Sequence, residues 1–352
     1  MSEPHNIYVH VPFCMAKCRY CAFWSMANPC PDWNAYQTKI ISEINEWGDR
    51  LGADTVVPTV FFGGGTPSLM PVDVFGHIIQ AIYQKFAISP DAEITIEANP
   101  GTLDKDKLMG FVASGVNRIS IGVQSFDDEK LKFLGRIHDA RTAWHAIEQA
   151  MSTGVRVSGD FIYGMPGDTP DTVRNLCREI NNLGISHCSL YELTIEPNTP
   201  FGKMNLDMPS NNEMADMYTT ISDTLKLPRY EVSNYAVAGN ECRHNMNVWD
   251  GEPYIGIGRG GAGRPYINNV WYEQMGGRAQ CTPMSDTERA IERIITGMRT
   301  VRGVRMDGAV QNIINMDWIR AHPDLVRVHD NRISATSAGM LILDDIVLNM
   351  TE

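Results

Sequence analysis

The sequence lacks long apolar runs, low-complexity tracts and short-period repeats. Nowhere among its 352 residues is there a stretch of about 18 apolar residues, so we expect no transmembrane segment. The opening MSEPHN also lacks the basic segment and apolar run of an export signal, which predicts a cytoplasmic location. With 43% apolar residues, the composition is that of a globular chain with a large buried core.

An excess of positive charge is also missing. The chain has 30 Lys and Arg residues against 42 Asp and Glu residues, which gives a formal net charge of −12. From Ser285 onward it carries eight arginines, no lysine and ten acidic residues, so its last part is acidic as well. Because a negative surface repels phosphate groups, this charge argues against nucleic acid as a partner.

The cysteines do not form the framework of a disulfide-rich secreted protein. There are eight in a long chain, and five of them are scattered, which is typical of buried thiols. These five are Cys30, Cys177, Cys188, Cys242 and Cys281. The other three stand together in one short segment.

That segment reads YVHVPFCMAKCRYCAF and places Cys14, Cys18 and Cys21 in a CxxxCxxC spacing. Thiolates this close in sequence can converge on one centre, and three of them can hold a 4Fe-4S cube while leaving its fourth iron open to an exchangeable ligand. A structural zinc site is the alternative. Such sites more often combine two CxxC pairs, and the chain has no second pair, so the spacing favours the cluster.

Short strand-like runs alternate with helical stretches in the first part of the chain. One predicted helix begins after Asp139 and ends at Gly154, and its apolar face consists of Ala143, Ile147, Ala150 and Met151. The predicted strands span residues 6–11, 57–62, 92–97, 117–122, 155–161 and 186–192. Such alternation predicts an α/β fold with parallel strands, closed into a barrel or part of one.

Several predicted strands end in glycine-rich or polar segments, where parallel α/β folds bind their ligands. The second strand is followed by GGGTP at residues 63–67, a turn in which backbone groups can approach a ligand closely. Glu97, Gln124 and Asp160 stand at the next three strand ends, and Arg136 follows on a helical segment. Carboxylates accept hydrogen bonds from amines and hydroxyls, while arginine pairs with a carboxylate, so together they suit a zwitterionic, hydroxyl-bearing ligand.

A series of blocks makes the chain resemble the HemW family of heme chaperones, within the radical S-adenosylmethionine superfamily and related to the oxygen-independent coproporphyrinogen III oxidases. The blocks are YVHVPFCMAKCRYCAF, FFGGGTPS, TIEANPGTL, RISIGVQSF, GDFIYGMPGDT, YEVSNYA and HNMNVW. This resemblance implies a partial (βα)6 TIM-like barrel, a 4Fe-4S cluster on Cys14, Cys18 and Cys21, and S-adenosylmethionine on the open iron. By motif position, the cofactor pocket would be lined by Tyr8, Tyr20, Gly64, Gly65, Thr66, Glu97, Gln124, Arg136 and Asp160.

Two features of the sequence bear on which activity the resemblance implies. In the oxidases a fourth cysteine extends the motif to CxxxCxxCxC, whereas this chain has Phe23 there, and only seven residues precede Tyr8. Both differences favour heme delivery over porphyrin oxidation. A radical enzyme acting on a porphyrin, by decarboxylation, methyl transfer or ring opening, and a redox or structural cluster protein are the alternatives.

The heme-associated HNxxYW motif of the family is present in altered form. The chain reads HNMNVW, with His244 and Trp249 kept and Val248 in place of tyrosine. An imidazole is a common axial heme ligand and an indole can pack on a porphyrin, and Cys242 is a further candidate ligand. The family's GIGPGAHG reads GIGRGGAG here, with Arg259 and Ala262 as the departures.

We divide the chain into a radical SAM barrel (1–205), a family-specific extension (206–284) and a small winged-helix-like domain (285–352). The last begins with Ser285 and Glu288, a capping-box pattern, followed by apolar residues at helical spacing. The implied partners are heme, a heme-accepting respiratory protein, an electron donor such as flavodoxin or ferredoxin, and a second copy of the chain.

Overall fold

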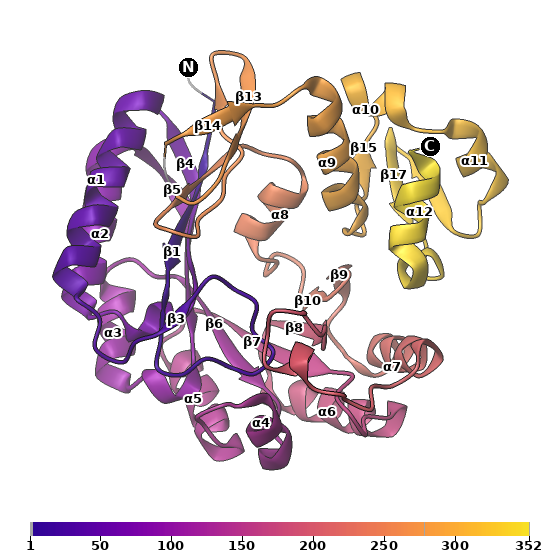
Figure 1. The fold of residues 1–352 in the computed structure, drawn as a ribbon, viewed down its shortest axis with the longest axis horizontal. Helices are drawn as coiled ribbons and strands as arrows, with labels where there is room; N and C mark the ends of the chain where they lie inside the picture. Colours follow the sequence, from indigo (N-terminus) through magenta and orange to yellow (C-terminus); the bar gives the residue numbers. More distant parts are fainter. Residues whose placement is uncertain (1–2, 278, 352) are drawn as a thin grey trace.

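A nine-stranded sheet forms the centre of the computed structural model, which describes residues 3–277 and 279–351 (Figure 1). Six parallel strands form its middle, in the order of the sequence, and each is joined to the next by at least one helix. They are β1 (Asn6–Val11), β4 (Val56–Gly64), β5 (Ala87–Ala98), β6 (Arg118–Gln124), β7 (Arg156–Tyr163) and β8 (His187–Glu192). All six predicted strands are therefore confirmed.

Three later strands complete the sheet at its two ends. β11 (Tyr254–Ile257) adds in parallel beside β1, while β10 (Asn234–Ala236) lies antiparallel beside β8 and is followed by β9 (Arg229–Glu231). The sheet order, β11-β1-β4-β5-β6-β7-β8-β10-β9, runs from β11 to β9 without pairing the two, so the barrel is partial among the described residues.

Helices cover the outer face of the sheet, as Figure 1 shows. They are α1 (Trp33–Leu51), α2 (Val72–Lys85), α3 (Lys105–Ala113), α4 (Asp128–Leu134), α5 (Ala140–Ser152), α6 (Pro170–Leu183) and α7 (Asn211–Thr224). Asp139 caps α5 by accepting from the Thr142 amide at 2.8 Å, as predicted. Met151 departs from the prediction: it is 38% exposed, because α5 buries Ala146 in its place on the sheet side.

The two faces of the sheet differ in chemistry because side chains alternate along each strand. The outer face is apolar and packs against the helices, with Val9, Phe62 and Ile121 fully buried. The inner face is polar yet also buried, and carries Glu93, Thr95, Arg118, Ser158, His187 and Ser189. A buried polar face needs internal partners, which the helix α8 (Arg243–Trp249) helps to provide.

The last part of the chain packs around a core of its own, which includes Ile294, Met298 and Ile346. It comprises α9 (Asp286–Met298), β15 (Val304–Arg305), α10 (Gly308–Ile313), α11 (Met316–Ala321), β16 (Val326–His329), β17 (Arg332–Ala335) and α12 (Leu343–Met350). The elements follow the order helix, strand, two helices, two strands and helix, with a small β15-β17-β16 sheet, and the winged-helix-like domain stays a prediction. Ser285 and Glu288 form the predicted capping box of α9.

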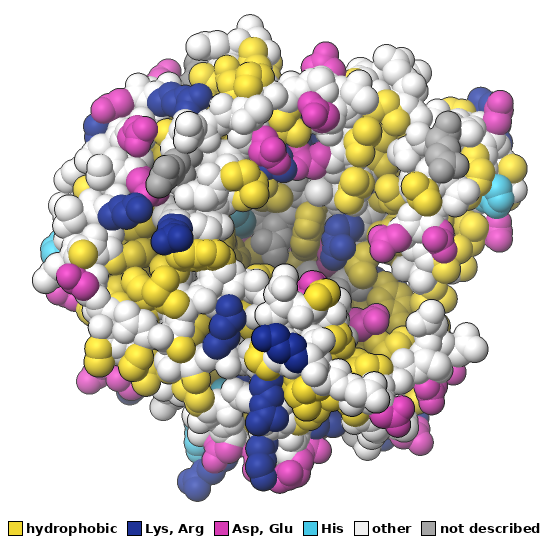
Figure 2. Space-filling model, viewed as in Figure 1, with side chains coloured by type: hydrophobic (Ala, Val, Ile, Leu, Met, Phe, Trp, Pro, Cys, Tyr) yellow, Lys and Arg dark blue, Asp and Glu magenta, His cyan; other side chains and the backbone are white. Residues whose placement is uncertain are grey.

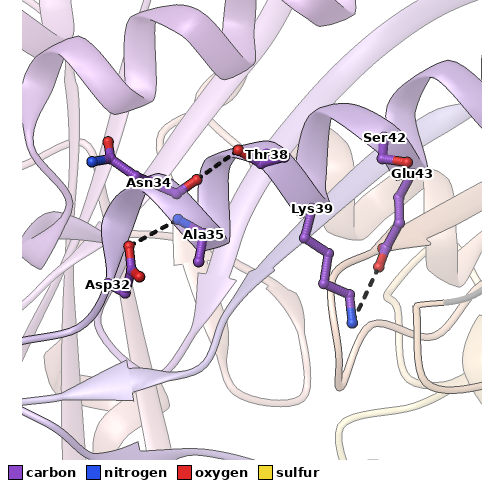
Figure 3. Close-up of a pocket in the computed structure, with 7 residues that line it drawn as sticks. All are labelled: Asp32, Asn34, Ala35, Thr38, Lys39, Ser42 and Glu43. Atoms are coloured by element: carbon purple, nitrogen blue, oxygen red, sulfur yellow. Dashed lines mark hydrogen bonds and ion pairs between the residues drawn. The ribbon is translucent and has the colours of Figure 1, made fainter.

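Three smaller features complete the description. β2 (Phe13–Cys14) pairs with β3 (Met26–Ala27), and β12 (Tyr266–Ile267), β13 (Val270–Gln274) and β14 (Cys281–Pro283) form a separate sheet. A hollow of about 730 Å³ lies along the first half of α1 (Figure 3), where Glu43 meets Lys39 at 3.9 Å and accepts from the Gly258 amide at 2.6 Å. No described helix is long and apolar enough to span a membrane.

Candidate functional site

The three clustered cysteines lie in the loop after β1, beside the carboxyl ends of the parallel strands. Cys14 is buried and Cys18 and Cys21 are half-buried, and the Cys21 amide donates to the Cys18 carbonyl at 3.3 Å. Burial raises the pKa of the Cys21 thiol, and the nearby Cys18 and Cys14 sulfurs raise it further. Within the described residues, no three His, Cys, Asp or Glu side chains are arranged to hold a metal ion. The loop therefore places the three thiols near one another, but the described side chains do not form a complete metal site.

The glycine-rich turn after β4 packs directly against this loop. The Gly65 amide donates to the Val11 carbonyl at 2.7 Å, and a Cβ at Gly65 would lie 2.7 Å from the Phe13 carbonyl oxygen and 3.0 Å from Cys14 Sγ. Gly64 has φ of 111°, and a Cβ there would collide with the His10 ring. Glycine is therefore required at both positions, and the turn is a cradle rather than a simple bend.

Two carboxylates, Glu97 on β5 and Asp160 on β7, belong to strands that lie on either side of β6. Burial raises the pKa of Glu97 to about 8, and the charge of Asp160 adds to the effect, although the Gly64 amide donates to Glu97 at 3.2 Å. Burial also raises the pKa of Asp160, against the hydrogen bond from Ser120 at 2.9 Å. Two buried carboxylates without a bound cation are costly, so the pair is well suited to an amino group and hydroxyls.

Arg136 connects three of the segments that make the site. Its Nη1 donates to Cys18 Sγ at 3.2 Å, its Nη2 donates to the Gly122 carbonyl at 2.9 Å, and it also contacts the Asn99 side chain. Its Nε is buried without a hydrogen-bond partner, which leaves a donor for a ligand. Gln124 takes up a left-handed backbone (φ 69°), and its Nε2 would lie 2.9 Å from a Cβ at Gly122. Both side chains therefore converge on Gly122.

Two residues of the site were missed from the sequence. Asn99 donates to Thr66 Oγ1 at 2.9 Å and so joins the glycine-rich turn to Arg136. His10 contacts the Tyr8 hydroxyl at 3.1 Å and the Trp24 carbonyl at 2.8 Å, and lies against Gly64. Asn99 precedes Pro100 at a strand end, and His10 interrupts an apolar strand two residues after Tyr8. A polar residue at each of these strand positions was the sequence feature that could have identified Asn99 and His10.

The two aromatic residues of the predicted pocket lie on either side of it. Tyr20 is beside Arg136, and burial is the main cause that raises the pKa of its hydroxyl. Burial likewise raises the pKa of Tyr8, whose ring stacks on Phe61 at 6.2 Å. These residues come from six separate segments, and they are Tyr8, Tyr20, Glu97, Gln124, Arg136 and Asp160. Thiolates beside paired carboxylates and an arginine are a donor set that fits a thiolate-bound cluster with a zwitterionic ligand.

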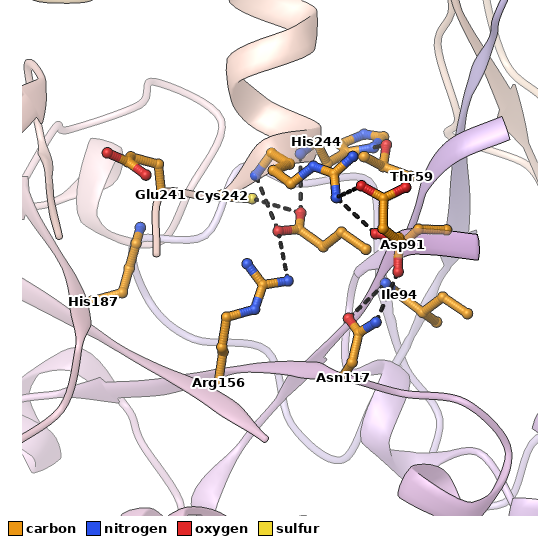
Figure 4. Close-up of polar contacts among 12 residues, drawn as sticks. Thr59, Asp91, Ile94, Asn117, Arg156, His187, Glu241, Cys242 and His244 are labelled. Atoms are coloured by element: carbon orange, nitrogen blue, oxygen red, sulfur yellow. Dashed lines mark hydrogen bonds and ion pairs between the residues drawn. The ribbon is translucent and has the colours of Figure 1, made fainter. Parts of the chain in front are cut away.

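The structure places His244 beside Thr59 inside the barrel (Figure 4), and its ring centroid lies 6.5 Å from that of Tyr8, a residue of the predicted cofactor pocket. Its Nδ1 is 2.7 Å from Thr59 Oγ1, and its amide donates to Glu93 Oε1 at 3.0 Å. The imidazole is 5% exposed and its ring lies 5.1 Å from that of Phe61. Burial lowers the pKa of His244 to about 4, so it is neutral at physiological pH. No face of this ring is open to a porphyrin.

The other two candidate heme residues are not brought beside the His244 ring. Trp249 packs with Tyr230 and Met246, and lines a cavity of about 590 Å³ between the extension and the last domain. Cys242 is fully buried, and burial raises the pKa of its thiol to about 12, so it stays protonated. His244 and Trp249 both belong to α8, but their side chains pack in different environments.

Comparison with known proteins agrees with this architecture. Residues 8–180 match the family described as the radical SAM superfamily. The heme chaperone HemW of Escherichia coli is 38% identical over 268 residues, which cover 74% of this chain and 70% of that protein. The heme chaperone HemW of Lactococcus lactis is 31% identical over 327 residues, covering 87% and 84%. The solved coproporphyrinogen III oxidase of E. coli superposes with a TM-score of 0.81 at 20% identity, over 99% of this chain and 90% of that one.

The sheet, the cysteine loop and the matched superfamily define the class as radical SAM proteins. Within that class, the chain belongs to the HemW family.

Proposed function

We propose that this chain is a heme chaperone that binds a 4Fe-4S cluster, S-adenosylmethionine and heme, and transfers heme to an acceptor protein. Its relatives named heme chaperone HemW are the observation that carries the proposal. The convergence of Cys18, Arg136 and Asn99 on one end of the sheet supports the cofactor part of it. The heme part depends on the family alone.

Under this proposal, Cys14, Cys18 and Cys21 hold the cluster, Glu97 accepts from the amino group of the cofactor, and Arg136 donates to its carboxylate. A cluster held there would, when reduced, supply the electron for cleaving a carbon–sulfur bond of S-adenosylmethionine. The chain itself orients the cofactor and excludes water. Tyr8, Tyr20, Gly64, Gly65, Thr66, Gln124 and Asp160 line the pocket.

A radical enzyme acting on a porphyrin is the second candidate, because coproporphyrinogen III oxidase shares the fold. Phe23 opposes it. This residue stands where the oxidases carry their fourth cysteine, and its phenyl ring, 69% exposed, has no atom that could replace a thiolate. A cytoplasmic location, a respiratory acceptor, a flavodoxin or ferredoxin donor and a homodimer complete the proposal.

One anaerobic experiment separates the two candidates. The protein is reconstituted with iron and sulfide, then given S-adenosylmethionine, dithionite and either coproporphyrinogen III or hemin. We expect hemin to bind and to pass to an apo-acceptor, with coproporphyrinogen III unchanged. Stoichiometric protoporphyrinogen would overturn the chaperone function. Cys18→Ala should lose the cluster absorbance, whereas Cys30→Ala, which removes an exposed thiol outside the triplet, should keep it.

A further inference from the structure

Exposed aromatic and basic side chains gather on the outer side of the cysteine loop. We define this aromatic–basic rim as Met15, Lys17, Phe23, Trp24, Met26 and Arg259. Its apolar members are 69% (Phe23), 45% (Met15), 41% (Met26) and 38% (Trp24) exposed. Figure 2 shows hydrophobic side chains with basic ones beside them over the region where Figure 1 draws β3. So many large apolar groups on one loop indicate a binding surface.

The rim is a built surface and not a loose loop. The Arg259 guanidinium lies 4.7 Å above the Trp24 ring, and Lys17 Nζ donates to the carbonyls of Phe23 and Ser25 at 3.2 and 3.3 Å. His10 holds the Trp24 carbonyl at 2.8 Å and the Tyr8 hydroxyl at 3.1 Å. Because Tyr8 belongs to the predicted cofactor pocket, His10 connects the rim to that pocket.

The charge of the rim is the reverse of the charge of the molecule. The two segments that build it, residues 4–31 and 253–272, contain no Asp or Glu, although the whole chain has a net charge of −12. Glu43 on α1 reaches the second segment, where it accepts from the Gly258 amide at 2.6 Å, and it also pairs with Lys39. An anionic ligand therefore meets Lys17 and Arg259 without a competing free carboxylate from these segments.

A large flat apolar ligand with carboxylates at one edge matches this surface, and heme is such a molecule. Aromatic and methionine side chains suit the macrocycle, and Arg259 and Lys17 suit its propionates. The other sites suit it less. The His244 ring is enclosed, and two of the arginines that line the cavity beside Trp249 are already paired, Arg293 with Asp307 at 2.7 Å and Arg289 with Glu292 at 2.5 Å.

Resting on the proposed function, we infer that heme docks on the aromatic–basic rim, with its macrocycle against Phe23 and Trp24 and its propionates at Arg259 and Lys17. Phe23 would then give heme an aromatic contact, which a cysteine at position 23 could not provide. Heme and the cofactor pocket are placed next to each other, joined through His10.

Hemin titration of the reconstituted full-length protein, followed by its Soret band, tests this inference. Phe23→Ala and Arg259→Ala should each weaken hemin binding roughly tenfold. Their matched controls are Tyr83→Ala, an aromatic side chain 52% exposed on α2, and Arg320→Ala, a guanidinium 70% exposed on α11, and both should bind like wild type. Hemin dimethyl ester lacks propionate charges, so Arg259→Ala should not weaken it further.

Each result decides the question. Rim variants that bind hemin as wild type does, or a loss confined to His244→Ala, would overturn the rim while leaving the proposed function intact. Rim variants that keep hemin but lose reduction by a flavodoxin would make the surface a protein-docking site instead. Wild type that binds no hemin would remove the proposed function itself. Equal cluster absorbance and melting temperature across the variants exclude misfolding as the cause.

Discussion

At the scale of single residues, burial decides the chemistry of the site more than residue type does. Glu97 and Asp160 are ordinary carboxyl groups whose pKa values rise because the inner face of the sheet removes them from water. On the same face, burial alone would raise the pKa of Glu93, but the Arg118 guanidinium and the amides of His244 and Arg243 outweigh it and lower the pKa. The pKa of Glu93 is therefore shifted in the opposite direction to the pKa values of Glu97 and Asp160 on the same face.

Glu97 makes the stability of the cofactor-free protein depend on pH. Its pKa is about 8 when folded and 4.5 when unfolded, so between these values the folded state binds more protons and stability falls as pH rises. In Glu97→Gln the side chain can still accept a hydrogen bond from the Gly64 amide, but it cannot ionise, so the variant does not lose stability in this way as pH rises. We expect the variant to gain a few kcal/mol over wild type between pH 5 and pH 8, since each pKa unit corresponds to about 1.4 kcal/mol.

Urea unfolding of the cofactor-free protein at both pH values measures this gain. The matched control is Glu129→Gln on α4, which removes the charge of an exposed acid and should lack the gain expected for Glu97→Gln. A Glu97→Gln curve parallel to that of wild type would contradict the raised pKa.

At the scale of elements, one buried carboxylate fastens α8 to the inside of the barrel. Glu93 on β5 accepts from the amides of Arg243 and His244 at 3.1 and 3.0 Å and pairs with Arg156 at 3.2 Å (Figure 4). It thus satisfies the first amides of a helix and neutralises an arginine at once. The fixed place of His244 follows from this attachment.

Glu93→Gln should destabilise the protein by about 3–5 kcal/mol, because it leaves Arg118 and Arg156 short of a counter-charge in the interior. Asp91→Asn is the matched control: it removes the partner of Arg243 on the same strand, but its side chain is 74% exposed, so it should cost far less stability than Glu93→Gln. Chemical denaturation of both variants gives the comparison. Equal costs would show that the buried attachment contributes nothing.

At the scale of the whole molecule, the last domain is joined to the barrel through a strand edge. The Val232 amide donates to the Arg299 carbonyl at 3.0 Å, and the Val301 amide to the Tyr230 carbonyl at 3.1 Å, so residues after α9 extend the sheet beyond β9. Glu231, which is fully buried, pairs with Arg299 at 2.7 Å across this junction. The separate core of the last domain is thereby held in one orientation.

Glu231→Gln should weaken the junction by on the order of 1–3 kcal/mol, the worth of hydrogen bonds to a charged group. Because the two cores are distinct, we expect calorimetry to resolve an earlier transition for the last domain. Asp317→Asn, which removes an exposed pair with Arg320 inside that domain, should leave the thermogram unchanged. A single unshifted transition for Glu231→Gln would contradict the coupling.

Local patterns predicted the framework because they depend on neighbours in sequence. The six strands follow from runs of branched and aromatic residues, and α5 and α9 begin at Asp139 and Ser285 because a side-chain oxygen can cap the amides that follow it. Met151 was misplaced because its helical phase lies at the edge of the apolar face, where the sheet contacts decide burial. Asn99 and His10 were missed because their partners are far away in sequence.

By itself, the sequence determined the class of the protein, the cysteine triplet and the strand ends that carry Glu97, Gln124 and Asp160, since spacing and strand period are properties of the chain alone. Only the tertiary structure decided where His244 and Trp249 lie and which side chains flank the cysteine loop. The reason is that segments distant in sequence supply their surroundings: Thr59 and Glu93 contact His244, and Arg259 reaches Trp24 from the turn after β11.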